Sequence, residues 1–360
     1  MIEFGRKTGT IFLVILFMAA GRLIAQAPKY SNEFLSLGVG ARSLALSGSV
    51  VAGNNGVYSG YWNPAGLVSS DKKYDIGLMH AEYFAGIAKY DYLGGAFKLD
   101  DSNSIGISII RFGVDDIPNT LELIDKDGNV RYDRIKTFSA ADYAFIFSYS
   151  RKTNIKGLSF GSNLKVIRRK TGDFASSWGF GLDAGAKYDY KKWQFGIMGR
   201  DITSTFNAWT FNNSELKEVF EITGNEIPEN SVELTIPKLI IGAARNISFS
   251  NKIDLMVELD ANVSFDGKRH SLVSSNSVSI DPCVGIELDY IDMIFLRFGF
   301  GNFQFIPGFN GKDEFSLQPN LGLGLHFKNF YIDYALTDIG DQSLALYSNI
   351  FSIRYKFSGK

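Results

Sequence analysis

The sequence predicts an all-β fold, a 14-stranded antiparallel transmembrane β-barrel with an N-terminal hatch in the lumen. Three observations predict this fold. Apolar and polar residues alternate along many segments, the connections between these segments alternate between short and long, and the composition combines 14% aromatic residues and 37 glycines with only 8 prolines. Side chains along a barrel strand point in turn to lipid and to lumen, with short turns on the periplasmic side and long loops outside.

The first 25 residues have the pattern of a secretory signal peptide. Arg6 and Lys7 precede an apolar run at 11–20, and small residues follow. This run is too short to span a bilayer, because a spanning helix needs about 20 residues. We therefore expect cleavage after Ala25, a hatch over 26–72 and a barrel over 73–358.

Period-two alternation marks the strands of the barrel. Between 252 and 265, for example, the apolar residues occupy the odd positions and the polar residues, with Met256, occupy the even ones. The same pattern predicts fourteen strands, at 74–84, 88–99, 103–113, 139–151, 156–168, 177–190, 192–201, 237–248, 252–265, 281–290, 293–303, 315–327, 329–338 and 347–357. Each is long enough to cross a membrane when tilted.

The connections predict which side of the membrane each strand end faces. After the first connection, short and long connections alternate strictly, and the longest are 114–138 and 202–236. A soluble β-sandwich or solenoid in the periplasm, the alternative fold, gives no reason to put all long loops on one side. We therefore expect the cell outer membrane as the location, with lipid around the barrel, both chain ends in the periplasm and the two long loops extracellular.

Charged residues within the strands must face the lumen, since lipid cannot solvate them. They form a predicted lumen charge network of Asp254, Glu258, Asp260, Arg297, Asp333 and Arg354. An acid–base pair or a cation path is the alternative use of such carboxylates. Pairing with inward basic residues is favoured, because no spacing selects a particular pair.

Motifs for catalysis or ligand binding are weak in this background. Gly179 to Gly185 resembles part of a dinucleotide loop, but these residues lie in a predicted strand with no helix after it. Asp125 to Asn129 lacks the spacing of a calcium loop. The three histidines are scattered, and Cys283 is the single cysteine. We expect no catalytic residue, no metal and no cofactor, and the net charge of −1 gives no basis for nucleic-acid binding.

Residues 30–70 do not alternate like the wall. They mix small and apolar residues, too polar for lipid and too apolar for a free tail. Because they precede the first strand, the lumen is the nearest place to bury them. Pro64 fixes its own φ and biases Asn63 away from helix, while the Asn63 side chain can bond to the backbone of a turn.

Two stretches carry a family resemblance: "GVGARSLALSGS" at 38–49 and "YWNPAGL" at 61–67. Together they resemble the N-terminal signature of the PorV branch of the PorV/PorQ family of Bacteroidota, within the FadL-type outer-membrane barrels. The resemblance implies a hatch motif made of Trp62, Asn63, Pro64, Ala65 and Gly66. Residues 53–60 are rich in glycine and asparagine, where relatives carry acidic residues.

The resemblance implies two functions. PorV-like members are partners in the type IX secretion system, which predicts a non-enzymatic scaffold that docks a large translocon barrel, secreted proteins, or both. The docking residues would be in the long loops, at Ile117, Leu121, Leu123, Phe206, Trp209, Phe211 and Phe220. The alternative is a FadL-like transporter of hydrophobic small molecules, and a second alternative is a subunit of another outer-membrane assembly complex. Burial of these loop residues among themselves is the structural alternative to docking.

Overall fold

Strands dominate the computed structural model, which describes residues 31–125, 127–212, 217, 220, 226–307, 313–339 and 347–358. The predicted signal peptide lies outside these residues. The strands are β1 (Tyr74–Tyr83), β2 (Ala88–Lys98), β3 (Asn103–Asn119), β4 (Lys136–Lys152), β5 (Leu158–Thr171), β6 (Ala175–Tyr190), β7 (Trp193–Arg200), β8 (Phe206–Phe211), β9 (Ser231–Leu234), β10 (Lys238–Ser250), β11 (Ile253–Ser264), β12 (Val273–Ser274), β13 (Ser279–Tyr290), β14 (Ile294–Pro307), β15 (Asp313–Phe327), β16 (Phe330–Thr337) and β17 (Ser348–Phe357).

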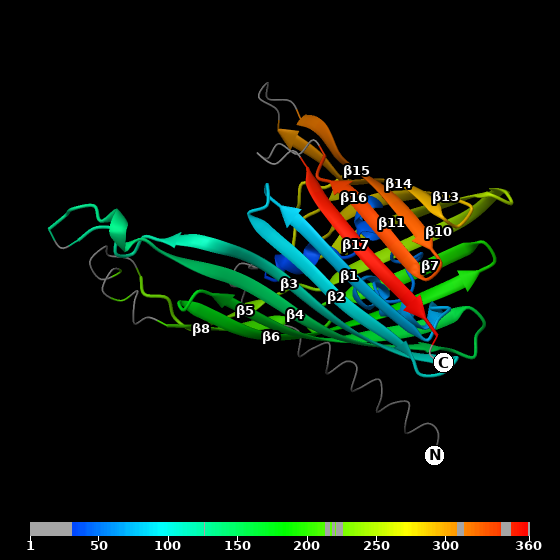
Figure 1. Ribbon diagram of the computed structural model, residues 1–360, viewed down its shortest axis with the longest axis horizontal. Helices are drawn as coiled ribbons and strands as arrows, with labels where there is room; N and C mark the ends of the chain where they lie inside the picture. Colours follow the sequence, from blue (N-terminus) through cyan, green and yellow to red (C-terminus); the bar gives the residue numbers. More distant parts are fainter. Residues whose placement is uncertain are drawn as a thin grey trace, which may run out of the picture.

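Fourteen of these strands close into an antiparallel ring, as predicted. Each pairs with its neighbours along the chain, β7 pairs with β10, β11 pairs with β13, and β1 closes the ring against β17 with Tyr74 opposite Phe357. The three others, β8, β9 and β12, lie at the outer rim and pair with wall strands or with each other. Figure 1 shows the tilted strands around the ring, with both ends of β17 beside β1.

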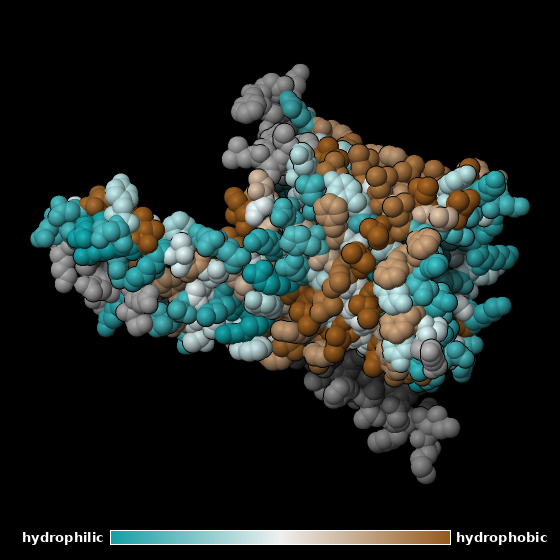
Figure 2. Space-filling view, in the orientation of Figure 1, coloured by the Kyte–Doolittle hydropathy of each residue, from teal (hydrophilic) through white to brown (hydrophobic). Residues whose placement is uncertain are grey.

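The two faces of the wall differ as the alternation predicts. In β1, Ile76 and Leu78 are exposed on the outer face, whereas Met79 and Ala81 are buried on the lumen side. Figure 2 shows the apolar residues gathered in a band across the barrel, with hydrophilic residues at its ends. A closed ring leaves no strand edge inside the band, which is the condition for a sheet to span a bilayer. The protein is therefore a membrane-spanning barrel.

Several strands extend beyond the band, which corrects the predicted loops. The loop predicted at 114–138 is reduced to 120–135, because β3 and β4 continue past a bulge between Val114 and Ile117. The loop predicted at 202–236 contains β8 and β9, which extend the lines of β7 and β10. The connection expected at 169–176 covers only 172–174. In Figure 1 these extensions form the arm at the left of the view.

Short helices lie in the lumen before the first strand. They are η1 (Glu33–Ser36), α2 (Ala41–Ala45), α3 (Ser59–Trp62) and η2 (Pro64–Ser69), and a further turn, η3 (Tyr132–Arg134), lies in the outer arm. Figure 1 shows the first of these, in blue, inside the ring of strands. We call residues 31–70 the hatch. Among the described residues, no helix has the length and apolar character needed to cross a membrane.

Candidate functional site: the hatch and the cavity above it

The Trp-Asn-Pro sequence forms a fixed corner between α3 and η2. Asn63 ends α3 in an extended conformation, and Pro64 begins η2. The side-chain Oδ1 of Asn63 accepts the N–H of Ala65 at 3.2 Å, which caps η2. Its Nδ2 donates to the carbonyls of Val51, in the hatch, at 2.9 Å and of Ala186, in the wall, at 3.1 Å. One buried amide therefore joins the corner to the rest of the hatch and to β6.

Two aromatic residues before this corner pack against one wall arginine. The Tyr61 and Trp62 rings meet edge to face at 5.0 Å, and the guanidinium of Arg200 lies 4.5 Å from the Tyr61 ring centre. Trp62 Nε1 donates to the Val39 carbonyl at 2.8 Å, and Tyr61 donates to the Leu35 carbonyl. The corner thus also holds the segment between η1 and α2, some twenty residues earlier in the chain.

Wall glycines form a seat for the backbone of the hatch. A Cβ on Gly161 would lie 2.3 Å from the carbonyl carbon of Pro64, and one on Gly196 would lie 2.3 Å from the Val51 oxygen. A Cβ on Gly185 would lie 2.2 Å from Asn63 Oδ1. Such distances are far shorter than van der Waals contact, so the hatch fits only against a wall that has no side chain there.

Two wall carboxylates accept four consecutive N–H groups of the hatch. Asp260 Oδ2 accepts the amides of Val50 and Val51 at 2.8 and 2.9 Å. Glu258 accepts the amides of Ala52 and Gly53 at 2.7 to 3.0 Å. Both carboxylates are buried. This strip of hatch forms no secondary structure that could pair its donors, so the wall supplies the acceptors.

Ion pairs join hatch and wall at two further places. Arg42 pairs with Glu287, which pairs with Arg297, which in turn reaches Asp333 at 2.7 Å. Across the ring closure, Arg354 bonds to Asp75 with its Nε at 2.8 Å and to the Asn55 carbonyl at 3.0 Å. Asp75 also accepts the N–H of Val57 at 3.0 Å.

The structure thus brings five of the six predicted network residues to the hatch or to its partners: Glu258, Asp260, Arg297, Asp333 and Arg354. Asp254 was wrong as a network member, since it is exposed at the periplasmic end of β11 and forms no ion pair within the described parts of the chain. Asp75 and Arg42 were missed. Arg42 lies in a helix of the hatch, where period-two alternation gives no signal. Asp75 lies in the predicted strand 74–84, so the rule that charged strand residues face the lumen could have found it.

A third cluster of charged residues, which the sequence pattern did not predict, lies between the end of β7 and the start of β8. Lys165 is buried and pairs with Asp183 at 2.7 Å and with Asp201. Thr205 also donates to Asp201, and the Asp201 N–H donates to Asp183 at 2.8 Å. The interrupted backbone at 201–205 is therefore held by these side chains in addition to backbone hydrogen bonds such as that from the Ile202 N–H to the Leu182 carbonyl at 2.9 Å.

Tyr58 and Asp125, both outside the membrane-spanning strands, have shifted pKa values. Burial, with the nearby Tyr92 phenol, raises the pKa of Tyr58 in the hatch, so its hydroxyl stays a donor to the Leu78 carbonyl at 3.0 Å. In the outer loop, the backbone N–H and the side chain of Asn129 donate hydrogen bonds to Asp125. These bonds hold the pKa of Asp125 below its usual range, although desolvation acts in the opposite direction. Those bonds close the turn at 125–129 on itself. The N–H groups of Asp127 and Asn129 both donate to Asp125 Oδ1, at 3.0 and 2.9 Å.

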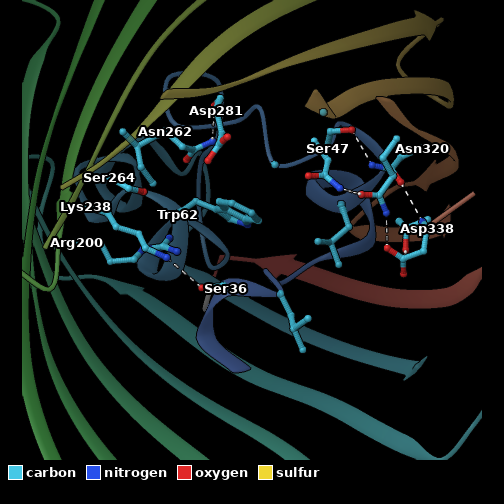
Figure 3. Close-up of a pocket in the computed structure, with 18 of the residues that line it drawn as sticks. Ser36, Ser47, Trp62, Arg200, Lys238, Asn262, Ser264, Asp281, Asn320 and Asp338 are labelled. Atoms are coloured by element: carbon cyan, nitrogen blue, oxygen red, sulfur yellow. Dashed lines mark hydrogen bonds between the residues drawn. The ribbon is translucent and has the colours of Figure 1, made fainter. Parts of the chain in front are cut away.

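A cavity of about 340 Å³ lies above the hatch, towards the outer mouth. Trp62 stands at its centre in Figure 3, with Arg200 and Lys238 to one side and Asn320 and Asp338 to the other. Its apolar lining comes from Leu37, Leu44 and Trp62 in the hatch and from Tyr83 and Ile240 in the wall. Most of the lining is polar and includes charged side chains, those of Arg200, Lys238, Arg269, Asp281 and Asp338. Ser36, also in the lining, accepts a bond from Lys238 at 3.5 Å. This cavity could hold a small molecule, since its volume lies in the range of ligand pockets.

The predicted docking residues are spread over strands and loop. Ile117 lies in β3, and Phe206, Trp209 and Phe211 lie in β8, whereas Leu121 and Leu123 are half-buried in the 120–135 connection. Phe206 packs against Phe180 at 5.9 Å. The Trp209 ring lies under Arg169 at 5.1 Å. Phe220 is half-buried.

Fold and site together define a class: a 14-stranded outer-membrane barrel whose lumen is filled by a hatch. Among solved structures, the fold is similar to the P. putida toluene transporter TodX, with 13% identity, a TM-score of 0.56, and 90% of this chain and 99% of that one covered. It is also similar to CymD, a monoaromatic hydrocarbon channel, with 13% identity, a TM-score of 0.53 and coverage of 90% and 98%.

The toluene transporter TbuX of Ralstonia pickettii gives 12% identity, a TM-score of 0.51 and coverage of 89% and 98%. No protein-family model matches the sequence, and neither does any curated protein. At these identities the likeness concerns the fold alone.

Proposed function

We propose that the protein carries small hydrophobic molecules across the outer membrane, with the hatch as the gate. The observation that carries this proposal is the cavity of about 340 Å³ between the outer mouth and the hatch. Leu37, Leu44 and Trp62 of the hatch give it an apolar floor, so a bound molecule would rest on the part that must move. Of the two functions that the sequence predicts, the fold comparison supports transport better than a role in secretion.

The solved structures with a similar fold suggest a molecule with which to test this proposal. TodX and TbuX are toluene transporters and CymD is a monoaromatic hydrocarbon channel. Toluene fits within 340 Å³ and carries no charge, so its passage needs no partner for a charge in the lumen. Toluene crosses a plain phospholipid bilayer unaided, so the test uses vesicles with a lipopolysaccharide outer leaflet. We expect such vesicles to take up labelled toluene faster with the purified protein than without it, above all at low concentration.

The single native cysteine allows the gate to be locked. Ser49 in the hatch is buried, and its hydroxyl donates to the backbone carbonyls of Glu258 at 3.0 Å and of Cys283 at 3.3 Å. The substitution Ser49→Cys therefore puts a second thiol beside Cys283. We expect oxidation to join hatch and wall and to stop uptake, and a reductant to restore it.

The matched control is Ser49→Cys combined with Cys283→Ser, which keeps one thiol and cannot form the bond. Oxidation should leave its uptake unchanged. If the wild-type protein adds nothing to toluene uptake, the transport proposal fails. If the protein increases uptake but oxidation of the Ser49→Cys variant does not reduce it, the protein is a transporter and the hatch is not its gate.

A second candidate function is the predicted role as a partner of a protein export machine, of the PorV-like type. One observation favours it. The outer arm carries exposed apolar side chains far from the lipid-facing band, with Ile124 66% and Tyr132 74% exposed, and Figure 2 shows apolar patches near the tip of that arm. Apolar groups held in water at the end of a projecting hairpin suit a protein contact.

Affinity purification of a tagged copy from native membranes tests this role. Recovery of a large translocon barrel or of secreted proteins supports it, provided that Ile124→Ser with Tyr132→Ser reduces the recovery. Other large barrels and lipoproteins would favour a different assembly complex. Recovery of the protein alone would rule out stable docking.

A further inference from the structure

The periplasmic turn between β4 and β5 is basic and carries no acid. Residues 149–160 include Arg151, Lys152 and Lys156, all exposed, and neither aspartate nor glutamate. The turn lies at the end of the barrel where the other connections are short, so it faces the inner leaflet of the membrane. Three cations therefore stand together at the level of lipid headgroups.

A groove of about 490 Å³ lies beside these cations. Tyr149 and Phe160 line it, and they are 42% and 51% exposed on the outer face of the barrel. Arg151 lines it too and lies opposite Phe160 in the strand register, so both side chains project from the same face. The groove thus has an aromatic part that continues the lipid-facing band and a cationic part at its rim.

Four other cations on the same rim already have partners, which the three cations of this turn lack among the residues that the structure describes. Lys73, Lys191 and Lys328 each lie over an aromatic ring at 5.2 to 5.7 Å, and Lys98 pairs with Asp101 at 3.5 Å. Within the described residues, Arg151, Lys152 and Lys156 make no ion pair and lie over no ring. Their charge is available to an external anion.

One carboxylate is close enough to interact with Arg151. This carboxylate belongs to Asp100, on the neighbouring β2–β3 turn. Hydrogen bonds, above all from the Asn103 side chain, lower the pKa of Asp100, and the positive charge of Arg151 helps to lower it at a distance longer than that of an ion pair. The Asp100 carboxylate is itself bonded to the Asn103 side chain at 2.8 and 2.9 Å and to two backbone amides. Asp100 keeps its negative charge, so it offsets at most one of the three positive charges and leaves the turn basic.

We propose that this groove binds the headgroup of an anionic glycerophospholipid of the inner leaflet. The phosphate would lie between Arg151 and Lys152, and the first part of an acyl chain would lie along Tyr149 and Phe160. Basic pockets at the membrane surface bind anionic headgroups, and each cation adds affinity there. A free phosphate would use the cations but would leave the exposed aromatic wall uncovered.

Native mass spectrometry of the full-length protein tests the site. The protein, stripped of lipid in detergent, is titrated with phosphatidylglycerol or phosphatidylcholine of matched chains. We expect at least about tenfold tighter binding of phosphatidylglycerol to the wild type, since each cation contributes about fivefold. The variant Arg151→Gln, Lys152→Gln, Lys156→Gln should bind both lipids equally.

A matched variant removes the same charge from other turns of the rim: Lys191→Gln, Lys192→Gln, Lys252→Gln. It should keep the preference for phosphatidylglycerol. The proposal would be overturned if this variant lost the preference, or if the variant that lacks Arg151, Lys152 and Lys156 kept it. The preference would then come from the overall charge of the rim and not from this groove. Slow migration of unheated samples in gel electrophoresis would identify a variant that has not folded.

Two further experiments distinguish a lipid from free phosphate as the ligand of the groove. Tyr149→Ser with Phe160→Ser should weaken phosphatidylglycerol binding while all three cations remain. Inorganic phosphate at millimolar concentration should compete poorly. If phosphate displaces the lipid fully, or if the aromatic variant binds as well as the wild type, the site recognises phosphate and not a lipid.

Discussion

Arg42 of the hatch and Glu287 of the wall form a two-point ion pair, in which Nε lies 2.8 Å from Oε2 and Nη2 lies 2.8 Å from Oε1. A bidentate pair fixes orientation as well as distance. It therefore holds α2 against β13 at one angle. Glu287 is also shared with Arg297, so the hatch is tied into a chain of charges that belongs to the wall.

Arg42→Gln should loosen α2. The substitution removes a charge-assisted pair worth about 2 kcal/mol and leaves Glu287 with Arg297 alone. We expect faster hydrogen–deuterium exchange at 41–45, measured by mass spectrometry in detergent. Arg42→Lys keeps the charge but loses the bidentate geometry, so its exchange rate at 41–45 should lie between those of the wild type and Arg42→Gln. Exchange as slow as in the wild type would mean that packing alone holds α2.

Asp260→Ala should release the strip at 50–53. It leaves two buried amides, of Val50 and Val51, without their acceptor, at a cost of about 2–5 kcal/mol in total. We expect these amides to exchange at least tenfold faster. Asp254→Ala is the control, since Asp254 is exposed in the same strand. Equal effects of the two substitutions would argue against a specific role for Asp260.

Gly161→Ala should push the hatch away from the wall. The added methyl would meet the Pro64 carbonyl carbon at 2.3 Å and the Ala65 nitrogen at 2.4 Å, and such overpacking costs about 1–3 kcal/mol. We expect higher single-channel conductance in a planar bilayer. Gly95→Ala provides the comparison, because nothing lies within 4 Å of a Cβ there. An unchanged conductance in Gly161→Ala would mean that this part of the hatch does not seal the lumen.

Asn63→Asp should damage the corner although it keeps the shape of the side chain. The carboxylate can still accept the Ala65 N–H, but it cannot donate to the carbonyls of Val51 and Ala186. We expect a loss of about 2–3 kcal/mol in hatch stability, seen as faster protease cleavage within 50–70. Asn63→Ala, which loses all these bonds, should be cleaved at least as fast. Wild-type resistance in the Asp variant would show that the donated bonds are dispensable.

The strands could be predicted because lipid imposes a strict alternation on the wall. In β11 the lumen residues Met256, Glu258 and Asp260 fall where that alternation puts them, and all three are buried. The strand ends were predicted less well. Outside the lipid both faces can be polar, so the alternation of β3 and β4 no longer marks them beyond the bulge at Val114.

The contacts of the hatch could not be predicted from sequence. Asn32 bonds to Thr235 and Ser49 bonds to the Cys283 carbonyl, across more than two hundred positions, and no local pattern carries such pairs. The wall glycines gave a partial signal. Gly185 lies in a predicted strand, and the structure adds that its missing side chain makes room for Asn63.

The ring closes through Asp75 in β1 and Arg354 in β17, which are 279 positions apart, and both residues also bond to the hatch. A pairing between the two ends of the wall closes the longest loop of chain, so its closure costs more entropy than that of any other strand pair. The hatch precedes β1 and meets both sides of this seam. A hatch left out of the barrel would deprive this seam of two of its partners, the Val57 N–H and the Asn55 carbonyl.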